Sequence, residues 1–305
     1  METEPRVSVV VPIYNSAATI GACIESILGQ TFTDLQLVLV DDGCTDGSGR
    51  ICDDYAASDS RVVVVHQQNR GRSEARWIGV EQADGYWLAF VDSDDTLPPY
   101  AIEQLHSMTD YATDIVLGNG QLLPPPQRTL LLNGEFRHMA VRAEGTIGVP
   151  WGSLYRREFL QHYFFDVPRD FYMGEDYIFW LRMAFATQQP VRVCCRNVYN
   201  KGAEHTSNSF VWTAAYAQRV DDLRRAAVPQ HLHDEYAADM LHDSIDNLFS
   251  VAVCSKRSEW SHSSFYDSVM ADARRLSMPL SVRQRAFLAL PSLRLRRLVA
   301  RLLMS

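Results

Sequence analysis

The residues best suited to chemistry lie in one acidic turn. Asp92, Asp94 and Asp95 directly follow the apolar run at residues 88–91. Such a run predicts a buried strand, and carboxylates packed at its end would repel one another and raise each other's pKa. A divalent cation would remove that cost. Asp92 and Asp94 are two residues apart, so in an extended chain they point to the same side, which suits Mg²⁺ or Mn²⁺ bound together with phosphate oxygens.

The turn has two other interpretations. A solvated acidic turn ahead of a helix is the first, since Pro98 and Pro99 follow it closely. A calcium-binding loop with Glu103 at its twelfth position is the second. That loop requires glycine at its sixth position, where this chain has Leu97. The calcium interpretation therefore fails, while the solvated turn stays open.

Alternating strand and helix patterns lead to the acidic turn. Uninterrupted apolar runs predict buried strands, and apolar residues at helical spacing predict helices. The predicted strands are residues 7–12, 35–40, 61–65 and 88–91, and the predicted helices are 20–28, a short one from Ser48, and 73–83. This alternation is typical of an α/β fold with a mostly parallel sheet flanked by helices, whose ligands bind at the carboxyl ends of the strands. Asp41 and Asp42 end the second strand, so we expect them at the same edge as the acidic turn.

The later part of the chain shows weaker patterns. Strands are predicted at residues 114–117 and 191–195, with an aromatic helix after Asp176. From about residue 210 the pattern is helical.

Composition and motifs exclude several classes of protein. The formal net charge of −8 over 305 residues argues against a nucleic-acid-binding protein. Neither a GxGxxG dinucleotide fingerprint nor a phosphate-binding GxxxxGK[ST] loop occurs. The six cysteines include no CxxC pair, and no run of eighteen apolar residues is present. The start, residues 1–5, is acidic and lacks the features of a signal peptide. Together these observations predict a cytoplasmic protein with reduced thiols.

Several segments together resemble glycosyltransferase family 2, whose members have the GT-A nucleotide-sugar fold. The resemblance extends from about residue 7 to residue 209, and the segments that carry it are residues 7–15, 39–47, 69–71, 75–76, 90–95 and 174–176. Trp77 stands where the family usually has Asn, and Cys44 where it often has Ser. We therefore expect a GT-A domain at residues 1–212 and a helical C-terminal region at residues 213–305.

The resemblance implies roles in binding a UDP-sugar donor. Asp42 would accept a hydrogen bond from the uracil N–H, while Pro12 and Tyr14 would lie against the base and ribose. Asp94 would be the main ligand of Mn²⁺ or Mg²⁺, with Asp92 facing the ribose and the waters of the metal. Ser93, between them, would also contact the substrate.

The resemblance also implies the chemistry of transfer. Asp176 would be the general base that takes the proton from the acceptor hydroxyl in an inverting reaction. Glu175 would contact the acceptor or favour the start of a helix. Arg76 would neutralise phosphate, with an exposed helix arginine as the alternative. The acceptor would be a saccharide or a lipid-linked oligosaccharide in cell-surface polysaccharide synthesis.

Other functions remain as alternatives. A nucleotidyltransferase that makes NDP-sugars would need a Gly-rich, basic loop after the first strand, and residues 12–18 do not provide one. A glycosidase with paired carboxylates would need no nucleotide. A non-catalytic sugar-nucleotide-binding protein would not need the intact carboxylates Asp92, Asp94 and Asp176.

Three further features each have more than one interpretation. His205 contacts a metal or phosphate, or has no role. Trp151 and Trp180 line an acceptor groove, or pack in the core. The last segment, residues 281–305, carries six arginines, no acid and an apolar stripe that includes Leu295 and Leu298. It lies on the anionic inner face of the plasma membrane, it packs on the domain, or it binds a partner.

Overall fold

The computed structural model describes residues 7–120, 129–143, 149–171, 173–202 and 211–304. The chain divides into two compact units. The N-terminal unit comprises Met1–Arg137 and Glu144–Glu204, and the C-terminal unit comprises His138–Ala143 and His205–Ser305. The predicted domain boundary at residue 212 stays a prediction.

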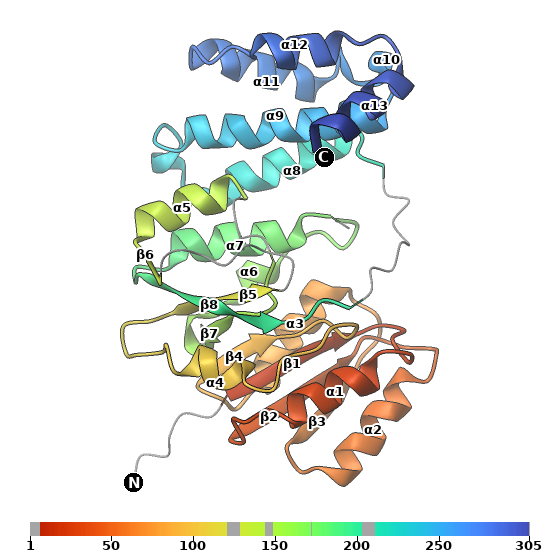
Figure 1. Ribbon diagram of the computed structural model, residues 1–305, viewed down its shortest axis with the longest axis vertical. Coiled ribbons are helices and arrows are strands. Elements are labelled where there is room, and N and C mark those ends of the chain that lie inside the picture. Colours follow the sequence, from red (N-terminus) through yellow and green to blue (C-terminus); the bar gives the residue numbers. More distant parts are fainter. Residues whose placement is uncertain (1–6, 121–128, 144–148, 172, 203–210, 305) are drawn as a thin grey trace. The chain divides into compact units, whose positions relative to one another are not determined.

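The N-terminal unit is built on one mixed sheet (Figure 1). Within the described residues the strand order is β3-β2-β1-β4-β7-β5-β8-β6. The strands are β1 (Val7–Ile13), β2 (Leu35–Asp41), β3 (Val62–His66), β4 (Trp87–Phe90), β5 (Ile115–Gly120), β6 (Leu130–Leu131), β7 (Leu154–Arg156) and β8 (Val191–Tyr199). The four strands predicted first, β1 to β4, are all parallel to one another. The second half is mixed, because β7 runs antiparallel to both β4 and β5, and β6 runs antiparallel to β8.

Helices connect and flank these strands. They are α1 (Ile20–Leu28), α2 (Ser48–Ser58), α3 (Arg72–Gln82), α4 (Ala101–His106), α5 (Asn133–Val141), α6 (His162–Phe165) and α7 (Glu175–Ala186), with a 3₁₀ turn, η1, at Arg157–Phe159. Helix α5 crosses the division between the two units. Every residue of β1 and β2 is buried, as the lack of alternation in their sequences predicts for central strands.

The strand order reverses between β1 and β4, which are adjacent in the sheet although β2 and β3 separate them in sequence. In sheets of this kind the ligand crevice lies at such a reversal, outside the carboxyl ends of the strands. Helix α3 packs closely on β1 because Gly79 has no side chain. A Cβ atom at Gly79 would lie 2.2 Å from Cγ1 of Val10. This approach brings the preceding turn of α3, which carries Arg76, to the reversal point.

Helix α7 supplies much of the aromatic core of this unit. Trp180 is fully buried and contacts Phe136 edge-on, with the ring centroids 5.9 Å apart. The interpretation of Trp180 as a core residue is therefore correct. Trp151 is only partly buried and stacks on Tyr199, with the ring centroids 4.3 Å apart.

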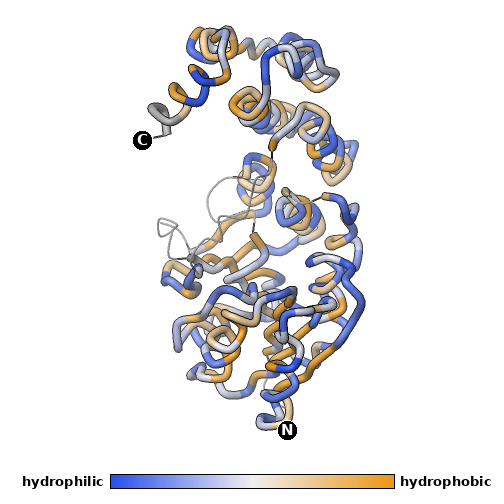
Figure 2. Tube along the Cα trace, turned by 90° about the vertical axis from the view of Figure 1, so that its right-hand side faces the viewer, coloured by the Kyte–Doolittle hydropathy of each residue, from blue (hydrophilic) through white to orange (hydrophobic). Residues whose placement is uncertain are grey.

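The described part of the C-terminal unit is largely helical. Its elements are α8 (Ala214–Ala227), a 3₁₀ turn η2 (Gln230–Leu232), α9 (Ala237–Cys254), α10 (Arg257–Trp260), α11 (Ser264–Arg275), α12 (Val282–Ala289) and α13 (Leu293–Met304). In Figure 2 these helices carry both apolar and polar residues around their turns, as expected of helices with one buried face. Their buried sides form a separate core that includes Leu248, Trp260 and Phe265. No helix in the described ranges is both long enough and apolar enough to cross a membrane.

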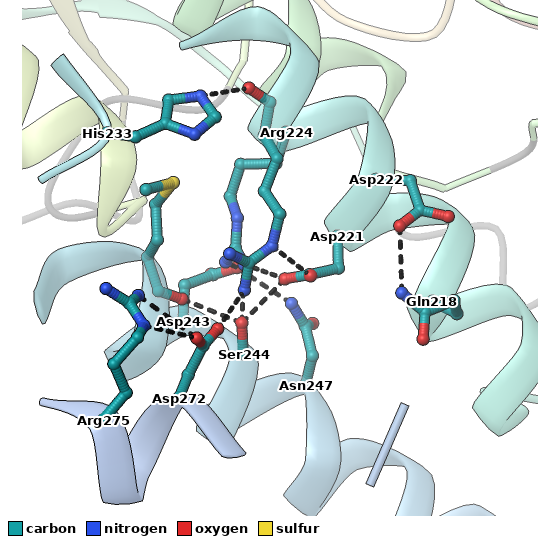
Figure 3. Close-up of polar contacts among 12 residues, drawn as sticks. Gln218, Asp221, Asp222, Arg224, His233, Asp243, Ser244, Asn247, Asp272 and Arg275 are labelled. Carbon is teal, nitrogen blue, oxygen red and sulfur yellow. Dashed lines mark hydrogen bonds and ion pairs between the residues drawn. The ribbon is translucent and has the colours of Figure 1, made fainter. Parts of the chain in front are cut away.

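A buried ionic network joins three helices of the C-terminal unit (Figure 3). Arg224 of α8 is fully buried and forms ion pairs with Asp221 of its own helix and with Asp243 of α9. Arg225 extends the network, because it contacts Asp221 at 2.6 Å and Asp272 of α11 at 2.7 Å. The network fixes α8, α9 and α11 to one another.

The basic last segment packs on its own unit. Arg296 of α13 is fully buried, and its guanidinium donates to the carbonyls of Ala252 at 2.6 Å and Ser255 at 2.9 Å. These carbonyls lie at the end of α9, where a cation also interacts favourably with the helix dipole. The packing alternative is therefore realised for α13, while Leu295 and Leu298 on the same helix stay exposed.

We expect Arg224→Met to weaken the C-terminal unit by about 3–5 kcal/mol, because it removes the cation paired with Asp243 and leaves the buried Asp221 with Arg225 alone. Hydrogen–deuterium exchange of the full chain should show faster exchange in α8, α9 and α11, with the sheet unchanged. Arg275→Met is the matched control, since Arg275 is largely exposed and contacts only Asp272 in this network. Equal protection in both variants would show that the network does not hold these helices.

Candidate active site

Three loops meet at the carboxyl ends of β1, β2 and β4. The loop after β1 is hydrogen-bonded to the loop after β2. The backbone N–H of Ser16 donates to Oγ of Ser48 at 2.8 Å, and that of Thr45 donates to Oδ1 of Asn15 at 2.9 Å. Asn15 has a φ of 51°, in the left-handed region that Asn tolerates better than most residues. The two loops therefore form one rigid edge.

Pro12 and Tyr14 lie on this edge. Pro12 is buried within β1, opposite Val40 of β2. Tyr14 follows the strand, and 55% of its surface is exposed. Its ring is therefore available to a ligand, whereas Pro12 can contribute only through the backbone around it.

Asp42 is buried and orders the loop that leads into α3. Its carboxylate accepts hydrogen bonds from Nε2 of Gln67 at 2.8 Å, from the backbone N–H of Arg70 at 2.7 Å and from that of Gly71 at 2.9 Å. A carboxylate has about four acceptor positions. Three are used here, which leaves one for a ligand.

The carboxylates of the acidic turn after β4 differ in their exposure to solvent. Asp94 is exposed, and the side chain of Asp92 is 28% exposed. Ser93, between them, is buried, and its Oγ lies 2.7 Å from Oγ of Ser16 in the loop after β1. The turn is thus fixed to the neighbouring loop while Asp92 and Asp94 stay accessible.

Asp95 has a different position from its two neighbours. It is buried, accepts a hydrogen bond from the hydroxyl of Tyr199 at 2.6 Å, and accepts another from the backbone N–H of Gly202 at 2.7 Å. Burial, together with Asp92 and Asp94, raises the pKa of Asp95 despite these hydrogen bonds. Asp95 therefore fixes the turn to the segment after β8 and does not face a ligand.

Arg76 connects the acidic turn to α7. Only 3% of its surface is exposed, so its interpretation as an exposed helix arginine is wrong. Its guanidinium donates to Oδ1 of Asp176 at 2.7 Å and to Oδ1 of Asp92 at 3.0 Å. Burial alone would lower the pKa of Arg76, but these two carboxylates raise it above its ordinary value. Its Nε is buried and has no hydrogen-bond partner among the described residues.

Glu175 and Asp176 form the first turn of α7 after Gly174, whose φ is 97°. Glu175 is buried and lies 3.2 Å from Nη1 of Arg72. Burial and the adjacent Asp176 raise the pKa of Glu175 to about 7. The side chain of Asp176 is 20% exposed, and its Oδ2 receives no hydrogen bond from the described residues. Asp176 is thus the more accessible of the two carboxylates.

The carboxylates at this site suit a divalent cation that is held partly by the protein and partly by a bound substrate. Within the described ranges, no group of three or more His, Cys, Asp or Glu side chains could hold a metal alone. Mg²⁺ commonly takes one or two carboxylates and completes its shell with waters and substrate phosphates. Asp94 and Asp92 offer such a pair. His205 lies outside the described residues.

Two residues beside the site, Tyr199 and Lys201, are not predicted from the sequence. Tyr199 donates to Asp95 and accepts from the backbone N–H of Asp92 at 3.1 Å. The ammonium group of Lys201 lies 5.9 Å above the ring of Trp151, which stacks on Tyr199. The predicted strand ended at residue 195, so no signal placed residues 199–201 near the acidic turn.

Open α/β sheets bind their ligands at such a reversal point, and acidic loops there suit a cation that is bound together with phosphate. The chain belongs to glycosyltransferase family 2, because the model described as "Glycosyl transferase family 2" matches residues 8–164, about half of the chain. This membership confirms the resemblance seen in the sequence.

Curated relatives cover parts of the chain. Glycosyltransferase GlyG of Streptococcus pneumoniae serotype 4 is 44% identical over 115 residues, which is 37% of this chain and 38% of GlyG. The uncharacterized glycosyltransferase EpsJ of Bacillus subtilis is 34% identical over 208 residues, which is 64% of this chain and 60% of EpsJ. The chain thus spans less than two-thirds of the length of these relatives.

Two solved structures share the fold. TarS of S. aureus, residues 1–349, in complex with UDP-GlcNAc has a TM-score of 0.59 at 17% identity, covering 90% of this chain and 93% of that one. The mannosyltransferase PcManGT of Pyrobaculum calidifontis, in complex with GDP-Man and Mn²⁺, has a TM-score of 0.59 at 18% identity, covering 94% and 79%. The predicted GT-A fold with a helical C-terminal region is therefore confirmed.

The raised pKa of Glu175 predicts a pH-dependent stability. Between the ordinary value of 4.5 and about 7, the folded protein holds a proton that the unfolded chain has released. The free energy of unfolding should therefore fall as the pH rises through this window. Thermal unfolding of the wild type and Glu175→Gln, from below pH 4.5 to above pH 7, should show the wild type losing stability relative to the variant. Parallel pH profiles would contradict the raised pKa.

Proposed function

We propose that the protein transfers a hexosyl group from a UDP-sugar, with inversion, to a hydroxyl of a saccharide or lipid-linked oligosaccharide in cell-surface polysaccharide synthesis. The observation that carries this proposal is the bridge of Arg76 between Asp92 and Asp176. The buried guanidinium of Arg76 holds both carboxylates in place. Asp92 would lie beside the donor phosphates, and Asp176 would take the proton.

The donor site would use the edge formed by β1 and β2. The exposed ring of Tyr14 would lie against the base or ribose, with the backbone around Pro12 beside it. The remaining acceptor position of Asp42 would take the uracil N–H. The complexes of TarS with UDP-GlcNAc and with UDP support uridine, whereas PcManGT binds GDP-Man.

The acidic turn would hold the cation. Asp94 would be its principal ligand, with Asp92 close by and Ser93 beside the donor. When bound, Mn²⁺ or Mg²⁺ would stabilise the negative charge that develops on the departing diphosphate. The Mn²⁺ in the complex of PcManGT supports a divalent cation here.

The proton would pass to Asp176. Arg76 occupies Oδ1 of Asp176 and thereby fixes the orientation of the carboxylate. Oδ2 would take the proton of the acceptor hydroxyl as its oxygen attacks the anomeric carbon and the bond from that carbon to the diphosphate oxygen breaks. Glu175 is more deeply buried than Asp176 and contacts Arg72. Through this contact Glu175 would help to orient Arg72 toward the acceptor.

The proposal extends to the place of the reaction. A lipid-linked acceptor would require contact with the inner face of the plasma membrane. The exposed Leu295 and Leu298 of α13 offer an apolar contact, and Arg294 beside them offers a positive charge. Peripheral contact of an otherwise cytoplasmic protein stays a prediction.

We expect Asp176→Asn to lower the rate of sugar transfer roughly a hundredfold or more, because an amide cannot accept the proton. Affinity for UDP in the presence of Mn²⁺, measured by calorimetry, should change little, since Asp176 contacts neither phosphate nor base in this proposal. Asp54→Asn, on an exposed position of α2, is the matched control and should leave both quantities unchanged.

The same variant separates the proposal from its rival. Unchanged turnover of the UDP-sugar in Asp176→Asn would contradict the role of Asp176 as base. Binding of UDP without any transfer by the wild type, across a panel of acceptors, would favour the non-catalytic sugar-nucleotide-binding alternative.

A further inference from the structure

A cavity of about 670 Å³, partly open to solvent, lies in the C-terminal unit. Its lining comes from α10, α11, α12 and the connection between α11 and α12. The apolar part includes Trp260, Met270, Leu280 and Leu288. A volume of this size is typical of sites for small molecules, and such sites are mostly apolar with a few polar groups.

Three arginines from three elements line the same cavity: Arg257 of α10, Arg274 of α11 and Arg285 of α12. Asp267 is the carboxylate that lines it. The side chains of Arg274 and Arg285 form no ion pair or hydrogen bond with any residue that the structure describes, and Arg257 makes one long hydrogen bond, 3.5 Å, to the carbonyl of Ala289. All three arginines are exposed to solvent, and they outnumber the one carboxylate of the lining, so the lining carries a net positive charge.

Two other arginines of the same unit, Arg224 and Arg296, are buried and have partners. Arg224 is held by buried carboxylates, and Arg296 is held by carbonyls at the end of α9. The contacts of these two arginines join helices of the unit, so both side chains have a structural role. Arg274 and Arg285 have no such role in the described part of the chain.

Trp260 belongs to the apolar part of the lining. Only 1% of its surface is exposed, and it lines the cavity. Its indole Nε1 is buried, so an occupant of the cavity would contact the ring of Trp260 and not its N–H. Aromatic rings of this kind are common in the apolar walls of ligand sites.

We propose that this cavity binds an anionic amphiphile, a phosphate monoester with an apolar chain. The planar guanidinium groups match phosphate oxygens, and the apolar lining would take the chain. A bare inorganic anion would leave the apolar part unused, and a neutral apolar molecule would leave the arginines unpaired. The proposal uses no residue of the transferase site, so either can fail without the other.

Calorimetry on the full chain tests this with three probes: dodecyl phosphate below its micelle concentration, dodecanol, and inorganic phosphate. Dodecyl phosphate should bind saturably and shift the indole N–H resonance of Trp260. The double variant Arg274→Glu/Arg285→Glu should weaken its binding by roughly tenfold or more. Arg50→Glu/Arg283→Glu is the matched control, because it changes the net charge equally at two other exposed positions, which lie outside the cavity.

The outcomes are distinct. Equal binding of inorganic phosphate or of dodecanol, equal weakening in the control variant, or no binding of dodecyl phosphate would each overturn the proposal. Co-sedimentation with phosphatidylcholine vesicles that contain phosphatidic acid, lost in Arg274→Glu/Arg285→Glu, would identify a membrane lipid as the source of the ligand. Binding of dodecyl phosphate without such co-sedimentation would identify a soluble phosphate ester.

Discussion

The candidate site depends on one buried guanidinium. The guanidinium of Arg76 contacts both Asp92, which follows β4, and Asp176 of α7. Asp176 is 100 residues away from Arg76 in the sequence. A buried charge is costly unless it is paired. Removing Arg76 would leave Asp92 and Asp176 without their cation, and removing either carboxylate would leave Arg76 with one partner fewer. The close packing of α3 on β1 at Gly79 brings the guanidinium to this place. The geometry proposed for donor and base therefore follows from how one helix packs on one strand.

Hydrogen bonds between loops make this arrangement rigid around its accessible groups. Ser16 contacts both Ser48 and Ser93, which ties the loops after β1, β2 and β4 together. Asp42 and Asp95, both buried, use their carboxylates to hold neighbouring backbone in place. Asp94, Tyr14 and one oxygen of Asp176 stay accessible to a substrate. A pre-organised set of this kind is what transition-state stabilisation requires.

The sequence was informative where local pattern determines structure. The apolar runs predicted β1, β2 and β4, and the acidic turn was correctly placed at the end of a strand. Tertiary contacts could not be predicted in this way. Helical spacing does not reveal that Arg76 is buried, because its partners lie far away in sequence. Asp94 and Asp95 are adjacent and chemically alike, yet Tyr199 and Gly202 engage only Asp95. Likewise, the basic pattern of the last segment did not indicate that Arg296 is fully buried against α9.

A crystal structure of the protein with UDP and Mn²⁺ would test the central claim most directly. We predict a cation bound between the diphosphate and Asp94, with Arg76 still joined to both Asp92 and Asp176. A cleft without nucleotide, or a bound nucleotide with Asp94 turned to solvent and Arg76 separated from Asp176, would contradict the account.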